Sequence, residues 1–335
     1  VNSNSRVLYD WHQGNFQVLD ITDPLVPSLI KSVETDSFSG EIYLDTANNI
    51  AYVPNRYTST DEAQTDRMYS FSTDEAAFDN LLSFTETSLG RDSYAISCCY
   101  PADRMWVTTS LNEIQYVDIG SDLAPGSMGL LTTMDDDAMM TVAEVYHIAL
   151  AANQGFLSRD GGGVLIMNLD EAGVSGVNPV DYFIQDVGQP RGIAVRNSNL
   201  YVVGEGNENG NWTRYLLVID VSGLTPLTDN EFTMSMDKDN DGLLIAMVDV
   251  GRSPQELLLT DDYAFVTNMD DDTVSVIDLA TNAVVATIAV GEEPFSLALY
   301  EDLAGVDQYV YVGNVQDNTI SVIDIASLAV VATYP

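Results

Sequence analysis

The sequence predicts an all-β fold made of seven repeated units, and two observations lead to this prediction. Apolar and β-branched residues alternate at a period of two, for example in residues 263–268 and 309–314, which is the period of a strand and not of a helix. A strand-closing position also returns at intervals of 46 to 58 residues, close to the roughly 40–50 residues of one β-propeller blade. The fold class is therefore a seven-bladed β-propeller of four-stranded antiparallel blades. The repeated positions are Asp20, Ser72, Asp118, Asn168, Asp220, Asp278 and Asp324.

Each unit is expected to contain four strands in the same order. The innermost strand follows a turn that ends in Pro, as at Pro190, Pro254 and Pro294. Gly permits this turn, and the missing N–H of Pro costs least at an edge strand. An aromatic-rich strand, a strand that closes with Asp or its substitute, and an outer strand follow. Together they form a single domain, whose units span residues 1–34, 41–88, 94–134, 145–186, 191–250, 256–291 and 295–335.

The first unit differs from the others because it begins at its second strand, residues 6–11, with no innermost strand before it. The chain also stops at Pro335, where the repeat predicts a further turn and a further innermost strand. We therefore expect that the chain is a fragment of a longer protein, or that the missing strand is supplied in another way.

The last two units carry the clearest family resemblance. Residues 265–294, FVTNMDDDTVSVIDLATNAVVATIAVGEEP, resemble the repeat of YVTN-type β-propellers, which occur in bacterial and archaeal surface-layer and secreted proteins. Residues 15–30, NFQVLDITDPLVPSLI, similarly resemble the LVIVD repeat. The resemblance implies a seven-bladed propeller in an extracellular setting. It implies no single activity, because propellers host many unrelated functions.

The charge of the chain excludes several partners. Acidic residues outnumber basic ones 51 to 12, for a formal net charge of −39. Binding to nucleic acid or to an anionic membrane depends on clustered Lys and Arg, so we expect neither nucleic-acid binding nor membrane insertion. No uncharged apolar run approaches the roughly 18 residues that a membrane helix needs. Because salt and calcium screen the self-repulsion of such a surface, we expect a secreted, periplasmic or cell-surface protein.

One acidic run has the spacing of a calcium loop. Asp237, Asp239 and Asp241 alternate along the chain and precede Gly242. Carboxylates at every second position of a turning loop can supply several of the six to eight oxygens that calcium requires. Val248 stands where an EF-hand would place its bidentate Glu, so the two hypotheses are a calcium-clipped surface loop and a solvated acidic turn.

Two further features suggest metal binding less directly. His12, His147 and Met139 offer the imidazole and thioether ligands that copper accepts, and secreted copper-binding proteins of methane-oxidising bacteria have a similar size and use two His. The alternative for His147 is a packed or channel-lining residue of an innermost strand. Cys98 and Cys99 are adjacent in a strand, so their side chains diverge and free thiols are expected, with an oxidised vicinal pair as the alternative.

Most of the other acidic residues have a structural interpretation. An Asp that closes a strand can accept backbone N–H bonds in an Asx-turn, and Ser or Asn can do the same. This interpretation covers the repeated positions that include Asp220 and Asp278. The runs 135–137 and 270–272 lie in connections, where adjacent side chains diverge into solvent.

The predicted function is a non-catalytic extracellular or cell-surface module for interaction or structure, stabilised by calcium. Its partner would be another protein or a second copy of the chain. The alternative is a calcium-dependent propeller hydrolase or lyase, in which a metal in the central channel polarises the substrate. That enzyme needs inward carboxylates, and the innermost strands offer Glu41, Asp45 and Glu256. The third hypothesis is a secreted copper-binding protein.

Overall fold

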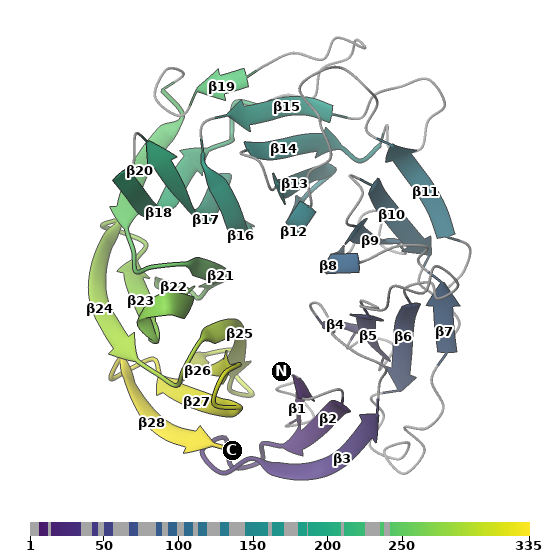
Figure 1. Cartoon of the computed structure of the whole chain (residues 1–335), viewed down its shortest axis with the longest axis vertical. Helices are drawn as coiled ribbons and strands as arrows, with labels where there is room; N and C mark the ends of the chain where they lie inside the picture. The colour runs from purple at the N-terminus through teal and green to yellow at the C-terminus, as the bar shows by residue number, and fades with distance from the viewer. Residues whose placement is uncertain are drawn as a thin grey trace.

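The computed structural model describes residues 7–12, 15–34, 42–45, 50–55, 67–72, 85–88, 93–98, 104–109, 113–118, 128–133, 145–159, 163–170, 180–185, 187–208, 211–224, 235–237 and 242–335. These residues form seven sheets arranged radially around a central axis (Figure 1). The prediction of an all-β, seven-bladed β-propeller is confirmed.

The first three blades come from the N-terminal part of the chain. Within the described residues the first sheet has three strands, in agreement with the missing innermost strand, and the next two sheets have four. Blade 1 contains β1 (Val7–His12), β2 (Asn15–Asp20) and β3 (Ser28–Glu34); blade 2 contains β4 (Tyr43–Asp45), β5 (Ile50–Asn55), β6 (Arg67–Ser72) and β7 (Thr85–Ser88); and blade 3 contains β8 (Ser93–Cys98), β9 (Arg104–Thr109), β10 (Glu113–Asp118) and β11 (Met128–Thr133).

One strand from the chain segment of blade 5 pairs with the sheet of blade 4, which the sequence does not predict. Blade 4 contains β12 (Val145–Ala151), β13 (Gln154–Arg159), β14 (Gly163–Asn168) and β15 (Val180–Gln185). A fifth strand, β19 (Ser235–Asp237), pairs parallel to β15, although it comes from the long connection within blade 5. Blade 5 itself contains β16 (Gln189–Arg196), β17 (Asn199–Glu208), β18 (Asn211–Asp220) and β20 (Leu244–Asp249).

Blades 6 and 7 are the near-identical repeats of the sequence and have the same construction. Each is a four-stranded antiparallel sheet. Blade 6 contains β21 (Pro254–Leu259), β22 (Tyr263–Asn268), the short 3-10 helix η2 (Met269–Asp271), β23 (Thr273–Asp278) and β24 (Ala283–Ala289); blade 7 contains β25 (Pro294–Glu301), β26 (Asp307–Asn314), β27 (Thr319–Asp324) and β28 (Ala329–Tyr334).

The core lies between neighbouring blades. The two middle strands of a blade are covered on both faces, which explains why runs such as Ala264–Phe265–Val266 are buried without alternation. Between blades 5 and 6, Val203 and Val218 pack in one cluster with Val266. Each interface of this kind removes apolar surface from water and fixes one blade against the next.

The ring closes by side-chain packing between blades 7 and 1. Leu8 and Ile21 of blade 1 form one buried cluster with Tyr300, Tyr311 and Val322 of blade 7. The Tyr311 hydroxyl also donates a hydrogen bond to the carbonyl oxygen of Pro24, at 3.0 Å. In Figure 1 the end of β28 lies beside blade 1. Among the described residues no strand is shared between these two blades.

The Gly of the inter-blade turn is required for space. The Gly251 N–H donates to Oδ1 of Asn268 at 3.0 Å, and Nδ2 of Asn268 donates to the hydroxyls of Thr273 and Ser275. A Cβ at Gly251 would lie 2.5 Å from Cγ of this Asn. The same contact joins Gly291 to Asn314, with 2.6 Å between the corresponding atoms. The Asn that ends β22 or β26 therefore fills the space that a side chain at the facing Gly would need.

This contact predicts that Gly251→Ala lowers the free energy of unfolding by about 1–3 kcal/mol, because the added methyl overpacks a filled site. Chemical denaturation of Gly251→Ala, of Asn268→Gly and of the double variant measures the coupling between the two positions. Gly251→Ala should cost less in the Asn268→Gly background. The control is Gly223→Ala, whose Cβ would have no neighbour within 4 Å. Equal losses for Gly251→Ala in both backgrounds would contradict the steric explanation.

Candidate functional site

The predicted calcium loop begins at the end of β19. Asp237 is the last residue of this strand and pairs in register with Gln185 of blade 4, so the run leaves the sheet of blade 4 and not that of blade 5. The side chain of Asp237 and the residues Asp239 and Asp241 lie outside what the structure describes. The calcium site therefore stays a prediction.

The candidate copper ligands are spread over the ring. His147 lies in β12 of blade 4, and His12 ends β1 of blade 1. These strands lie on opposite sides of the central axis (Figure 1). Met139 lies outside the described residues, as does Cys99, whereas Cys98 ends β8. Among the residues that the structure describes, no group of three His, Cys, Asp or Glu could hold a metal ion. Copper binding stays a prediction.

Five of the described innermost strands, β8, β12, β16, β21 and β25, carry a bulge near their first residues. In β21 the pairing shifts between Pro254 and Leu257, so Gln255 and Glu256 face one residue of β22. The Glu256 N–H donates to the hydroxyl of Thr267 at 2.9 Å. In β12 the His147 N–H donates to the Ser158 hydroxyl in the same way, at 3.1 Å. In both blades the bulge is thus held by a hydrogen bond from its backbone to a hydroxyl of the second strand.

The carboxylates that a channel enzyme would use do not converge in the described residues. Asp45 is buried at the end of β4 in blade 2, and Oε1 of Glu256 in blade 6 faces the N–H of Leu257 at 3.4 Å. The strands β4 and β21 lie on opposite sides of the axis (Figure 1). Glu41 lies outside the described residues.

An Arg and an aromatic ring meet at the bulges of blades 4 and 5. The guanidinium carbon of Arg191 lies 4.0 Å from the ring centroid of Tyr146. Arg196, Arg214 and Arg252 instead contact carboxylates. A cation–π pair therefore joins the innermost strands of blades 4 and 5 within a strongly acidic molecule.

The acidic run 270–272 binds protein donors. The N–H and the guanidinium Nε of Arg252 both donate to the carboxylate of Asp271, and the N–H of Glu293 donates to Asp272 at 3.0 Å. The backbone hydrogen bond from Arg252 is the main cause of the lowered pKa of Asp271. These hydrogen bonds fix the turns that lead into β21 of blade 6 and into β25 of blade 7.

The Asp residues that close the third strands are caps, as predicted. Asp278 accepts hydrogen bonds from the N–H groups of Ala280 and Thr281, and from the Thr281 hydroxyl. The hydroxyl bond is the main cause of its lowered pKa. In blade 4, where Asn168 takes this position, its Oδ1 accepts the N–H of Asp170. Equivalent bonds are made by Asp20, Asp220 and Asp324.

The outer strands of four consecutive blades present aliphatic side chains to solvent. In each strand the pairing shifts by one residue, and the extra residue is apolar. Its exposed fraction is 42% for Ile30, 50% for Ile245, 49% for Val285 and 45% for Val331. Sequence alternation alone missed this rim, although the doubled valines at 284–285 and 330–331 are its signal. We call these four residues the aliphatic rim.

A small pocket of about 300 Å³ lies between blades 4 and 5. Three connections form it: the turn between β12 and β13, the turn between β16 and β17, and the segment after β18. The Val221 N–H donates to the Ser198 carbonyl, and the Ser222 N–H donates to the Asp220 carboxylate, which fix the last two connections. The pocket is lined by Ala151, Ala152, Gln154, Phe156, Val195, Arg196, Asn197, Ser198, Val221, Ser222 and Leu224.

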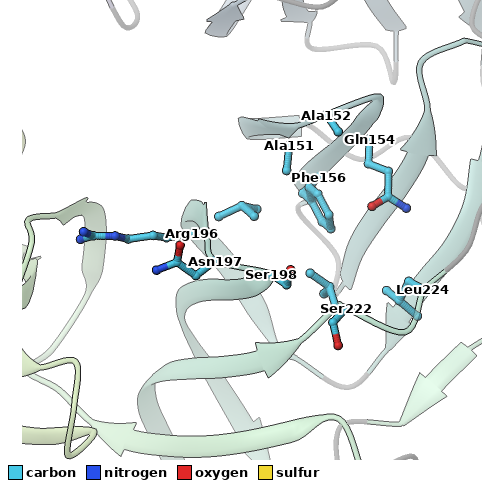
Figure 2. Close-up of a pocket in the computed structure, with 11 residues that line it drawn as sticks. Ala151, Ala152, Gln154, Phe156, Arg196, Asn197, Ser198, Ser222 and Leu224 are labelled. Atoms are coloured by element: carbon cyan, nitrogen blue, oxygen red, sulfur yellow. The ribbon is translucent and has the colours of Figure 1, made fainter.

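One charged side chain, that of Arg196, lines the pocket, and it is paired with a carboxylate. Figure 2 shows the Arg196 side chain extending away from Gln154 and Phe156. Its guanidinium donates to the Thr260 carbonyl and pairs with Asp261 at 2.7 Å. Nε2 of Gln154 is buried and has no hydrogen-bond partner among the described residues. The pocket can therefore hold a ligand by contact and by hydrogen bonds, without supplying a free charge.

Comparison with known proteins establishes the fold. No family model matches the chain, and no curated protein matches it. Kuenenia stuttgartiensis hydrazine synthase aligns with a TM-score of 0.68 and 13% identity, over 96% of this chain and 93% of that chain. The periplasmic gluconolactonase PpgL of Pseudomonas aeruginosa aligns with a TM-score of 0.65 and 14% identity, over 96% and 91%. The dihydro-heme d1 dehydrogenase NirN gives 0.61 and 13%, over 99% of this chain and 64% of that one.

These three structures are β-propeller proteins, and at such low identity the likeness concerns the fold. Among the described residues, no helix combines the length and the apolar character needed to cross a membrane.

The strand-closing caps predict a pH-dependent contribution to stability. The pKa of Asp278 lies below its ordinary value of 3.8 in the folded chain, so its stabilisation is present above pH 3.8 and is lost as pH falls through the folded pKa. Asp278→Ala should therefore lower the thermal midpoint at neutral pH. Its difference from the unsubstituted chain should shrink below about pH 4.

Asp278→Asn is the matched control, because Asn168 caps blade 4 without a charge. Its stability should fall less at neutral pH than that of Asp278→Ala. A constant difference between Asp278→Ala and the unsubstituted chain at every pH would contradict the assignment of a charged cap.

Proposed function

We propose that this chain is a non-catalytic β-propeller module of a secreted, periplasmic or cell-surface protein, which binds a protein partner or a second copy and is stabilised by calcium. We further propose that its repeats are of the YVTN type, as residues 265–294 indicate. The observation that carries the proposal is the aliphatic rim, because it repeats at the same position of consecutive blades and leaves its apolar side chains about half exposed to solvent.

The net charge of the molecule limits which partner surfaces can contact the aliphatic rim. A net charge of −39 opposes contact between most surfaces of two copies. The strands β24 and β28, AVVATIA and AVVATY, contain no Asp, Glu, Lys or Arg. Contact along these strands avoids burying unpaired charge, and it removes apolar surface from water. The part of the rim on β24 and β28, Val285 and Val331, thus favours a partner with a similar uncharged surface, which a second copy supplies.

Three independent features support a location outside the cytoplasm. The acidic surface suits salty or calcium-rich surroundings. The YVTN-type resemblance points to secreted and surface-layer proteins, and the similar gluconolactonase is described as periplasmic. A calcium-dependent hydrolase or lyase is the second candidate, since all three of the similar structures reported above are enzymes. We rank it lower because Asp45 and Glu256 lie on opposite sides of the ring.

Analytical ultracentrifugation tests the aliphatic rim. The unsubstituted chain should associate reversibly, and Val285→Ser combined with Val331→Ser should weaken association by about tenfold or more, because apolar contact area is lost. The matched control, Thr287→Ser combined with Thr333→Ser, changes exposed residues of the same strands and should have little effect. A chain that stays monomeric in millimolar calcium would contradict self-association.

Elemental analysis tests the proposal that calcium binds and stabilises the chain. Protein purified without chelators should contain about one calcium per chain, and chelation should lower its thermal midpoint. Asp239→Asn combined with Asp241→Asn should remove both effects, whereas Asp135→Asn combined with Asp136→Asn should not. No bound calcium, or stoichiometric copper, would contradict this assignment. Copper would instead direct mutagenesis to His12, His147 and Met139.

A further inference from the structure

The hairpin formed by β17 and β18 extends beyond the rest of blade 5. These two strands have ten residues each, the greatest length among the strands that the structure describes. The outer strand β20 pairs with β18 from Ile219 back to Tyr215, so residues 211–213 pair with β17 alone. In blade 6 the corresponding strands β22 and β23 have six residues each. The extension is therefore an addition to the repeated plan of a blade.

Burial of the side chains stops where the extension begins. Tyr215 is 1% exposed, whereas Thr213 on the same face of β18 is exposed, and Trp212 on the opposite face is 48% exposed. The base of the extension is held by an ion pair in which Nε of Arg214 lies 3.8 Å from Oε2 of Glu205. Both faces of the hairpin beyond this pair are open to solvent.

The end of the hairpin carries the single Asn-x-Ser/Thr sequence of the chain, Asn211-Trp212-Thr213. Glu208 pairs with Asn211, so only residues 209–210, Asn-Gly, connect the two strands. Asn-Gly is the favoured pair for the two-residue connection of a hairpin. Because strand residues two apart share a face, Asn211 and Thr213 lie on one face of the hairpin. The Asn therefore stands next to the connection, at the end of the extension that is remote from the blade.

We propose that Asn211 is the attachment site of an N-linked glycan. Asn-x-Ser/Thr with x other than Pro is the acceptor sequence for this modification, which occurs at exposed turns of proteins that leave the cytoplasm. In the transfer, the side-chain nitrogen of Asn211 bonds to the anomeric carbon of a sugar carried on a lipid diphosphate. The bond from that carbon to the diphosphate oxygen breaks, the nitrogen loses one proton, and the lipid diphosphate leaves. The step needs no oxidant or reductant.

The site is separate from the aliphatic rim. The rim residue of this blade, Ile245, lies where β20 pairs with Val218 and Ile219. Asn211 begins the same strand β18, so at roughly 3.3 Å per residue it lies about 23 Å along the strand from Val218. A glycan attached there stands at the opposite end of β18 from the rim. The proposal rests on the extracytoplasmic location in the proposed function, but not on the rim.

Mass spectrometry of the chain isolated from the organism that produces it tests the site. Trypsin cleaves after Arg196 and Arg214, so residues 197–214 form one peptide that contains the whole acceptor sequence. This peptide should carry the added mass of one or more sugar residues, and electron-transfer fragmentation should place that mass on Asn211. An unmodified peptide from secreted or surface-located protein would overturn the proposal.

Paired variants expressed in the same organism separate recognition of the acceptor sequence from folding of the hairpin. Asn211→Gln and Thr213→Val should both abolish the modification, whereas Thr213→Ser, which keeps the hydroxyl, should retain it. The Thr213 hydroxyl donates one long hydrogen bond to the Gly206 carbonyl, at 3.4 Å, so both Thr213 variants should keep the thermal midpoint of the unsubstituted chain. The control is Asn207→Gln on the facing strand, which should stay modified. Retention of the sugar by Thr213→Val would overturn the assignment.

Cell fractionation and ultracentrifugation distinguish failure of this proposal from failure of the proposed module. An unmodified chain outside the cytoplasm contradicts the glycan alone, whereas an unmodified chain in the cytoplasm contradicts both the glycan and the proposed location. Asn211→Gln should self-associate as the unsubstituted chain does, because the hairpin end is remote from the rim. Weakened association of this variant would overturn the separation of the glycan site from the rim.

Discussion

The structure depends on the packing of each blade against the next. The middle strands contribute side chains to both faces of their sheet, so a residue such as Val266 belongs to the interface with blade 5, and its neighbour Phe265 to the interface with blade 7. No blade has a complete core of its own. The contact between blades 7 and 1, through Tyr311 and Ile21, is therefore as necessary as the covalent links between successive blades. It completes the ring without a shared strand among the described residues.

Tight inter-blade packing also decides how polar groups are placed. Asn268 and Asn314 are buried and hydrogen-bonded, and each occupies the space that a side chain at the facing Gly would need. In blade 4 the equivalent strand end is Arg159, and burial lowers the pKa of its guanidinium. The blades thus share one backbone plan but not one set of polar contacts. Such differences between blades mark where the repeat has been modified.

The sequence predicts the fold well because its period is a property of the backbone plan. The interval between the capping positions and the two-residue alternation together specify blade number and strand order, and the caps at Asp220 and Asp278 behave as the Asx interpretation requires. Strand β19 could not be predicted, because it pairs with blade 4 across a long connection and depends on tertiary contact. The aliphatic rim could not be predicted from the sequence for a related reason. A bulge inserts one residue into the alternation, and this insertion is visible only once the register is known.

The pocket between blades 4 and 5 shows the same limit of prediction from sequence. Ala151 is an unremarkable residue in the sequence, and it gains meaning only when strand register makes it the equivalent of Arg196. Among the innermost strands that the structure describes, only β16 ends in Arg, whereas β4 ends in Asp45, β21 in Leu259 and β25 in Glu301, so the bridge from Arg196 to blade 6 is particular to one pair of blades. Contacts of this kind come from single side chains, which neither the repeat interval nor the two-residue alternation identifies.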